Sequence, residues 1–118
     1  MEYSESRRRF TCDLSRTPGT IVMALGGEFD VVCADAFKRR FADATEDEPE
    51  RVVLDLRELT FIDSTALALI LRVNDMSLEG NFMLSIVSLE GDPSTKIFRL
   101  TGTDKILPLV QEVPDVEV

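Results

Sequence analysis

The sequence contains no histidine and no tryptophan, and it contains only two cysteines. The absence of histidine excludes Ser-His-Asp and Cys-His catalysis, so acid–base chemistry would fall to carboxylates, lysines or Tyr3. Cys12 and Cys33 are too few for a four-ligand metal site, and their apolar neighbours predict buried free thiols. No apolar run approaches the roughly 18 residues of a membrane-spanning helix. We therefore expect no catalytic triad, no cofactor, no bound metal and no membrane span.

Basic residues are also scarce, because 22 acidic residues face 13 basic ones and give a formal net charge of -9. This charge repels nucleic acid and anionic membrane surfaces, so we expect neither as a partner. The run Arg7-Arg8-Arg9 is expected to be a solvated flank. No apolar segment follows the charged N-terminal residues, as a secretory signal would require, and we expect a cytoplasmic protein.

The 118 residues, of which 44% are hydrophobic, predict one domain over 1–118 with its core over about 10–110. Gly26-Gly27 is expected to end the second strand, and Asp30 to cap the first helix. The elements expected along the chain are strands over 10–15 and 21–25, a helix over 34–44, a strand over 52–56, a helix from 64 to about 79, a strand over 82–87, a helix capped by Asp92 and stopped by Gly102, and an edge strand over 106–110. This order predicts an α/β fold, a mixed β-sheet packed with helices.

The segment from Val52 to Leu71 carries most of the functional information. It reads as a buried strand, a short turn and an apolar helix, with Asp63 in the N-cap position. Ser64 and Thr65 then lie in the first helical turn, beside backbone N–H groups that have no partner within the helix. A modifiable serine is thereby predicted at the positive end of a helix.

Three motifs together resemble the STAS domain, and more closely the bacterial anti-sigma-factor antagonists. They are Gly27-Glu28-Phe29-Asp30, Phe61-Ile62-Asp63-Ser64-Thr65-Ala66-Leu67 and Thr101-Gly102-Thr103-Asp104-Lys105-Ile106. The resemblance spans Phe10 to Leu109. It implies a STAS-like fold and a binding module rather than an enzyme.

The resemblance also implies a switch. Family members bind an anti-sigma factor, typically a serine/threonine kinase, and so release a sigma factor; the kinase phosphorylates a serine to end the binding, and a phosphatase resets it. On this chain that serine is Ser64, and Asp30, Asp63, Thr65 and Ala66 are expected on the partner-binding face. We expect a monomer or a weak homodimer.

The sequence departs from the family pattern at Ala66 and Ala68, where the family usually has glycine. Alanine is the better helix former by up to about 1 kcal/mol, so the fold should not suffer, but the added methyl groups could crowd a partner. The amphipathic C-terminal helix usual in the family is also missing, because Pro114 opposes it.

Three other readings stay open at this stage. Ser64 and Asp30 can act as plain helix caps. The chain can be a non-switching STAS scaffold or a transporter-associated subunit in which Ser64 is never modified. An enzyme is disfavoured because the sequence has neither a P-loop nor a Rossmann fingerprint, and Asp30 and Asp63 alone are thin evidence for a metal.

Overall fold

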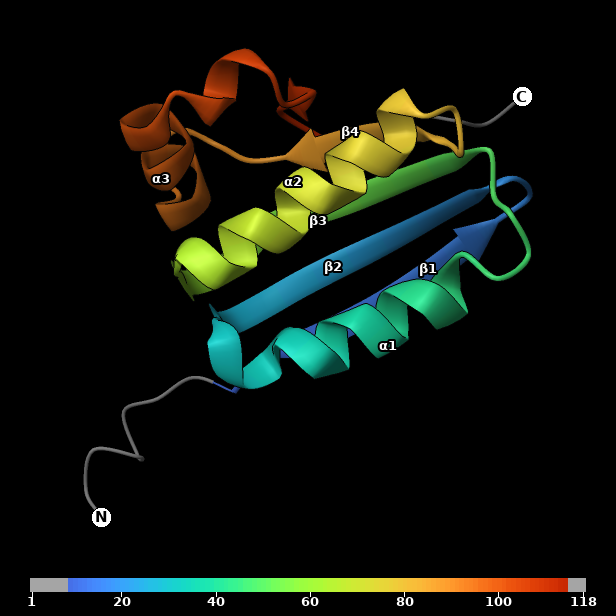
Figure 1. Ribbon diagram of the computed structural model, residues 1–118, viewed down its shortest axis with the longest axis horizontal. Helices are drawn as coiled ribbons and strands as arrows, with labels where there is room; N and C mark the ends of the chain where they lie inside the picture. Colours follow the sequence, from blue (N-terminus) through green and yellow to red (C-terminus); the bar gives the residue numbers. More distant parts are fainter. Residues whose placement is uncertain (1–8, 115–118) are drawn as a thin grey trace.

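The computed structural model describes residues 9–114, which form a five-stranded mixed sheet, three α-helices and two short 3-10 helices (Figure 1). In chain order the elements are β1 Thr11–Thr17, β2 Thr20–Phe29, η2 Val31–Cys33, α1 Ala34–Ala44, β3 Arg51–Ile62, α2 Ser64–Leu78, β4 Met83–Val87, α3 Pro93–Thr101, η3 Thr103–Lys105 and β5 Leu109–Val110. The predicted flank Arg7-Arg8-Arg9 lies outside the described residues except for Arg9, which is exposed.

The strands lie in the order β1-β2-β3-β4-β5, with β1 antiparallel to β2 and every later pair parallel. This confirms the predicted α/β fold. The crossovers from β2 to β3 and from β3 to β4 step in the same direction across the sheet, so right-handed connections place α1 and α2 on one face. Figure 1 shows these two helices side by side over that face, with α3 at the end of the sheet where α2 begins.

Both central strands are longer than the sequence predicted. The expectation that Gly26-Gly27 ends β2 was wrong, and so was the expected turn after Leu56. β2 and β3 continue together to Phe29 and Ile62 because two irregularities in their register absorb the extra residues of β3. Gly27 lies beside one of them with φ +77°, and a Cβ there would collide with the carbonyl of Arg9. A glycine that marks a strand end in sequence here continues a longer strand, opposite a bulge in β3.

The helix boundaries follow the sequence closely. α1 spans Ala34–Ala44 as predicted, and α2 begins directly after Asp63. Gly80 and Gly102 adopt φ +94° and φ +79°, which suits the left-handed residue after a helix. Asp92 occupies the N-cap position of α3, but its carboxylate accepts from the Leu89 N–H (2.8 Å) and not from the helix.

The core lies between one face of the sheet and the helices that cover it. β2 and β3 contribute alternate side chains, and α1, α2 and α3 close over them with aromatic and aliphatic residues. The largest fully buried side chains include Ile21, Met23, Leu25, Phe29, Phe37, Leu54, Leu56, Ile70 and Phe98. Both cysteines are buried and free, as predicted, and burial raises the pKa of each thiol. No helix within residues 9–114 is both long and apolar enough to cross a membrane.

The last strand differs from its prediction. Residues 103–105 form η3, so β5 is reduced to Leu109–Val110 at the edge of the sheet beside β4. Pro108 has no N–H to donate, but its carbonyl accepts from the Ile86 N–H at 3.0 Å. The edge position predicted from this proline is confirmed.

Candidate functional site

The candidate site lies where β2 and β3 end together. Phe29 and Ile62 are register partners in this parallel pair, so the next residues, Asp30 and Asp63, leave the sheet at the same end of the two strands. Asp30 begins η2, and Asp63 begins α2. The family resemblance implied that Asp30 lies near the segment of Asp63 and Ser64, and the structure brings the two segments together.

Asp63 connects the two segments that follow β2 and β3. One carboxylate oxygen accepts from the Ala66 N–H (2.9 Å), and the other accepts from the Val31 N–H (3.2 Å). Its own N–H donates to the Phe29 carbonyl at 3.3 Å. Asp63 therefore caps α2 and also holds the start of η2 against it. This side chain adds a direct link between the two segments beyond the pairing of β2 with β3.

Asp30 is turned inward. Its side chain is only 7% exposed, and one carboxylate oxygen accepts from the Val32 N–H (3.0 Å). Its N–H donates to the Cys33 sulfur (3.3 Å), which completes a capping box around η2. The predicted cap is thus confirmed, although it acts on η2 instead of α1. Direct contact between Asp30 and a partner stays a prediction.

Ser64 is the first residue of α2, and its side chain is exposed. Within residues 9–114 its hydroxyl makes no hydrogen bond, because Asp63 supplies the cap. The reading of Ser64 as a cap is therefore wrong. The Ser64 hydroxyl is therefore exposed and takes no part in the hydrogen bonds that start α2.

The two residues after Ser64 differ in exposure. Thr65 is half-buried, whereas Ala66 is fully buried with 0% exposure. The Ala66 methyl group faces the core, so the structure does not bring it to the surface where we expected partner contact. Ala68 is exposed one turn further on. Of the two alanines that replace family glycines, Ala68 is the one that meets solvent.

The sequence analysis did not identify the exposed apolar side chains at this end of β2 and β3. Val31 and Val32 in η2 are 62% and 78% exposed, and Phe61 near the end of β3 is 48% exposed. Together with Ser64 they define what we call the Ser64 face. Large apolar side chains left in water at one edge of a domain are typical of a protein-docking surface. Spacing alone does not give their exposure, because adjacent residues in a first helical turn can both be buried, as Ala66 and Leu67 are.

The Ser64 face has the electrostatic character of a helix N-terminus. The N–H groups of Ser64 and Thr65 have no hydrogen-bond acceptor among the described residues, and they carry partial positive charge. The described part of the chain contains no group of three or more Asp, Glu or Cys side chains arranged to hold a metal ion. The site thus combines the Ser64 hydroxyl, two backbone N–H groups without an acceptor among the described residues, and exposed apolar side chains.

Comparison with known proteins gives this fold and site a family. A sequence model of the STAS domain matches residues 11–116, and the chain belongs to the STAS domain family. Among its relatives is the anti-sigma-F factor antagonist RsfB of Mycobacterium tuberculosis, 27% identical over 97 residues, which cover 82% of this chain and 78% of RsfB. The family resemblance predicted from the three motifs is confirmed.

Solved structures agree with this assignment. The crystal structure of an anti-sigma factor antagonist from Mycobacterium paratuberculosis superposes with a TM-score of 0.77 at 27% identity, covering 89% of this chain and 88% of that one. Phosphorylated SpoIIAA, a Bacillus cell fate determinant, superposes with a TM-score of 0.58 at 20% identity, covering 88% and 93%. The likeness to SpoIIAA shows a shared fold.

Proposed function

We propose that this chain is an anti-sigma-factor antagonist whose binding is switched off by phosphorylation of Ser64. Unmodified, it sequesters an anti-sigma factor and so releases a sigma factor. The observation that carries the proposal is the exposed, unbonded hydroxyl of Ser64 at the end of β2 and β3 where Val31, Val32 and Phe61 are also exposed. The antagonist names of its relatives and the existence of a phosphorylated SpoIIAA support it.

Phosphorylation of Ser64 should leave the domain folded. A phosphate adds about -1.5 to -2 charges at pH 7. It would lie next to the unpaired N–H groups of Ser64 and Thr65, and an anion at a helix N-terminus is favoured by about 0.3 to 1 kcal/mol. The neighbouring Asp63 carboxylate repels it, but that carboxylate is already held by two N–H donors. The net effect of the phosphate on the free energy of unfolding is therefore small.

The interface responds more strongly than the fold. Val31, Val32, Phe61 and Ser64 all lie near the shared end of β2 and β3, so a partner that docks on the three apolar side chains would approach Ser64 as well. Burying a doubly charged phosphate without a counter-charge costs several kcal/mol. Even about 3 kcal/mol weakens binding on the order of a hundredfold. The switch therefore acts by occlusion and repulsion at the docking surface.

The partners follow from this role. We propose an anti-sigma factor that is itself a serine/threonine kinase, and a phosphatase that restores the hydroxyl, both acting on a cytoplasmic monomer or weak dimer without catalysis by this chain. The buried Asp30 and Ala66 would support the shape of the docking surface from beneath, while Asp63 and Thr65 would border it.

The test is phosphate transfer followed by binding. Incubating the chain with the kinase-type anti-sigma factor and ATP should add one phosphate, which mass spectrometry should place on Ser64 and which Ser64→Ala should abolish. Ser15→Ala is the matched control, because Ser15 is exposed on β1 and distant in sequence from the Ser64 face. Unchanged mass with retained partner binding would favour the non-switching scaffold, the second function that the fold permits.

A further inference from the structure

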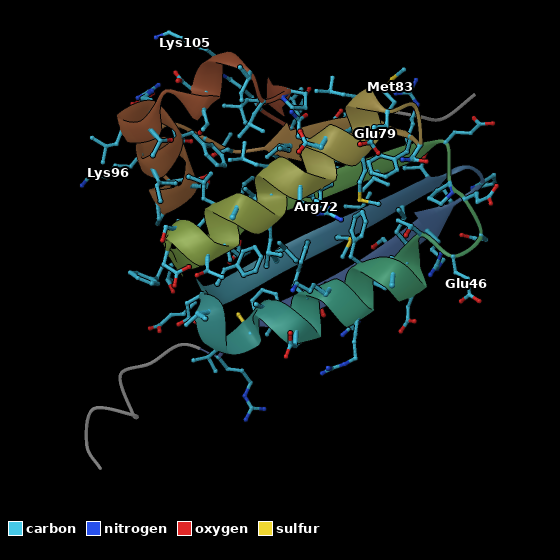
Figure 2. The ribbon with its side chains drawn as sticks, in the orientation of Figure 1. Glu46, Arg72, Glu79, Met83, Lys96 and Lys105 are labelled. Atoms are coloured by element: carbon cyan, nitrogen blue, oxygen red, sulfur yellow. The ribbon has the colours of Figure 1, made fainter. Side chains whose placement is uncertain are left out.

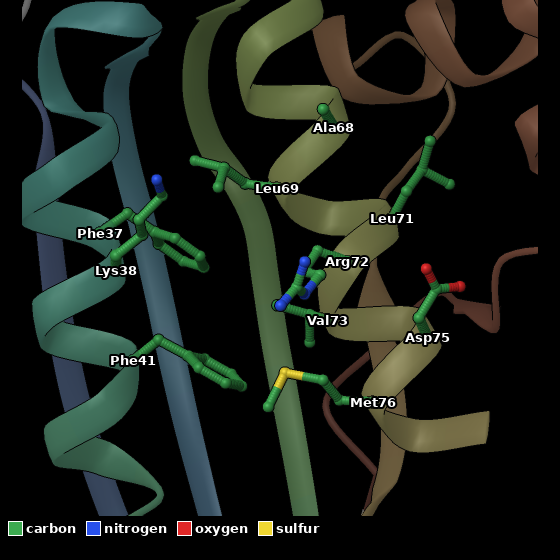
Figure 3. A pocket seen from close by; sticks show the side chains of 10 residues that line it. All are labelled: Phe37, Lys38, Phe41, Ala68, Leu69, Leu71, Arg72, Val73, Asp75 and Met76. Carbon is green, nitrogen blue, oxygen red and sulfur yellow. The ribbon is translucent and has the colours of Figure 1, made fainter. Parts of the chain in front are cut away.

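A second surface with the character of a docking site lies between α1 and α2. The two helices leave a groove of about 630 Å³, within the range of ligand-binding clefts (Figure 3). Phe37, Phe41 and Val73 form its buried floor, and the half-buried side chains of Leu69 and Met76 border it. The groove is therefore apolar where it is deepest and open to solvent above.

Cationic side chains stand on both walls of this groove. Lys38 projects from α1 and Arg72 from α2 (Figure 3), and both are exposed. Neither forms an ion pair with any residue between 9 and 114, although Asp75 lines the same groove. The formal net charge of the chain is -9. The groove therefore carries one cation on each wall above an apolar floor, although the chain as a whole is acidic.

We propose that this groove docks an amphipathic helix of a partner protein, with acidic residues on both flanks of its apolar stripe. Cations on opposite walls match acidic side chains on opposite flanks, as charges beside a helix interface do in coiled coils. The wall from Ala68 to Met76 is about 12 Å long at 1.5 Å per residue, so it fits two to three turns of helix. A second copy of this chain is a poor occupant, because two copies with charge -9 repel.

The groove is a neighbour of the Ser64 face and yet independent of it. Ala68, at one end of the groove, lies one helical turn after Ser64. A partner held at the Ser64 face can extend a helix along the groove. Helix docking can nevertheless be measured on the unmodified chain without kinase or ATP, so its outcome is separate from that of the proposed switch.

The experiment compares two synthetic peptides, each about 15 residues long, which share one leucine stripe. One peptide carries Glu on both flanks of the stripe, and the other carries Lys at the same positions. The overall charge of the protein favours the Lys peptide, whereas the groove favours the Glu peptide. We expect the Glu peptide to bind about tenfold more tightly and to shift the methyl resonances of Leu69 and Met76.

Charge reversal supplies the control. The double variant Lys38→Glu/Arg72→Glu should reverse the preference to the Lys peptide, whereas Lys96→Glu, on the outward side of α3 (Figure 2), should leave it unchanged. If the charge-reversed protein does not fold, Lys38→Ala/Arg72→Ala should abolish the preference instead. Equal binding of both peptides, or shifts away from Leu69 and Met76, would overturn the proposal. Binding of dodecanoate alone, with neither peptide bound, would also overturn it and would assign the groove to small amphiphiles.

Discussion

Replacing Asp63 with alanine should loosen the site and lower the stability of the whole domain. The substitution removes two hydrogen bonds from a carboxylate, one to the Ala66 N–H (2.9 Å) and one to the Val31 N–H (3.2 Å). The loss of an N-cap costs about 0.5 to 2 kcal/mol. The bond to Val31 adds about 1 kcal/mol, since Asp63 is half-buried and water replaces part of what is lost. We therefore expect a total of about 1.5 to 3 kcal/mol.

Thermal unfolding followed by circular dichroism measures this loss. At roughly 4 °C per kcal/mol for a domain of this size, the midpoint should fall by about 6 to 12 °C. Asp63→Asn retains one acceptor and should cost about half as much. Asp92→Ala is the matched control, because Asp92 occupies the N-cap of α3 but its carboxylate makes no hydrogen bond to that helix. If Asp63→Ala unfolds within about 2 °C of the unaltered chain, Asp63 does not hold the two segments together.

Three further perturbations probe the bulge, the docking face and one ion pair. Gly27→Ala should lower the free energy of unfolding, measured by chemical denaturation, by about 2 kcal/mol or more, because a side chain at φ +77° is strained and also meets Arg9. The control Gly91→Ala, at φ +91° with open space around it, should lower it by about 1 kcal/mol, and equal losses would contradict the steric argument. Val32→Asp should weaken anti-sigma binding by about tenfold without moving the unfolding midpoint, and unchanged affinity would place the interface elsewhere. Burial opposes ionisation of Asp55, but hydrogen bonds from Arg57 outweigh burial and lower the pKa of Asp55, so the ionised carboxylate stabilises the fold at neutral pH and this stabilisation is lost as the pH falls below the ordinary value of 3.8. Asp55→Asn should therefore reduce the fall in the free energy of unfolding at acid pH, and an unchanged fall would refute this reasoning.

Local sequence signals were sufficient for the elements that depend on neighbouring residues. Asp63 followed by good helix formers predicted the start of α2, and glycine after the last helical residue predicted where α2 and α3 end. Ser64 could be placed at the first turn for the same reason. Its exposure and its unbonded hydroxyl agree with that placement.

Features that depend on distant partners were not accessible in the same way. Gly26-Gly27 looked like a strand end because the pairing that carries β2 onward comes from β3, more than 30 residues later in the chain. The bond between Asp63 and the Val31 N–H likewise joins segments 32 residues apart. Ala66 was expected at the surface because spacing gives its helical position but not which side of α2 the sheet covers.

The most direct test of the proposed switch compares one partner with two forms of this chain. The affinity of the anti-sigma factor should be measured for the unmodified protein and for protein phosphorylated at Ser64, with unfolding midpoints for both. We predict that phosphorylation weakens binding on the order of a hundredfold and moves the midpoint by no more than about 4 °C. Equal affinity for the two forms, or a phosphorylated protein that no longer folds, would contradict a switch that acts at the docking surface.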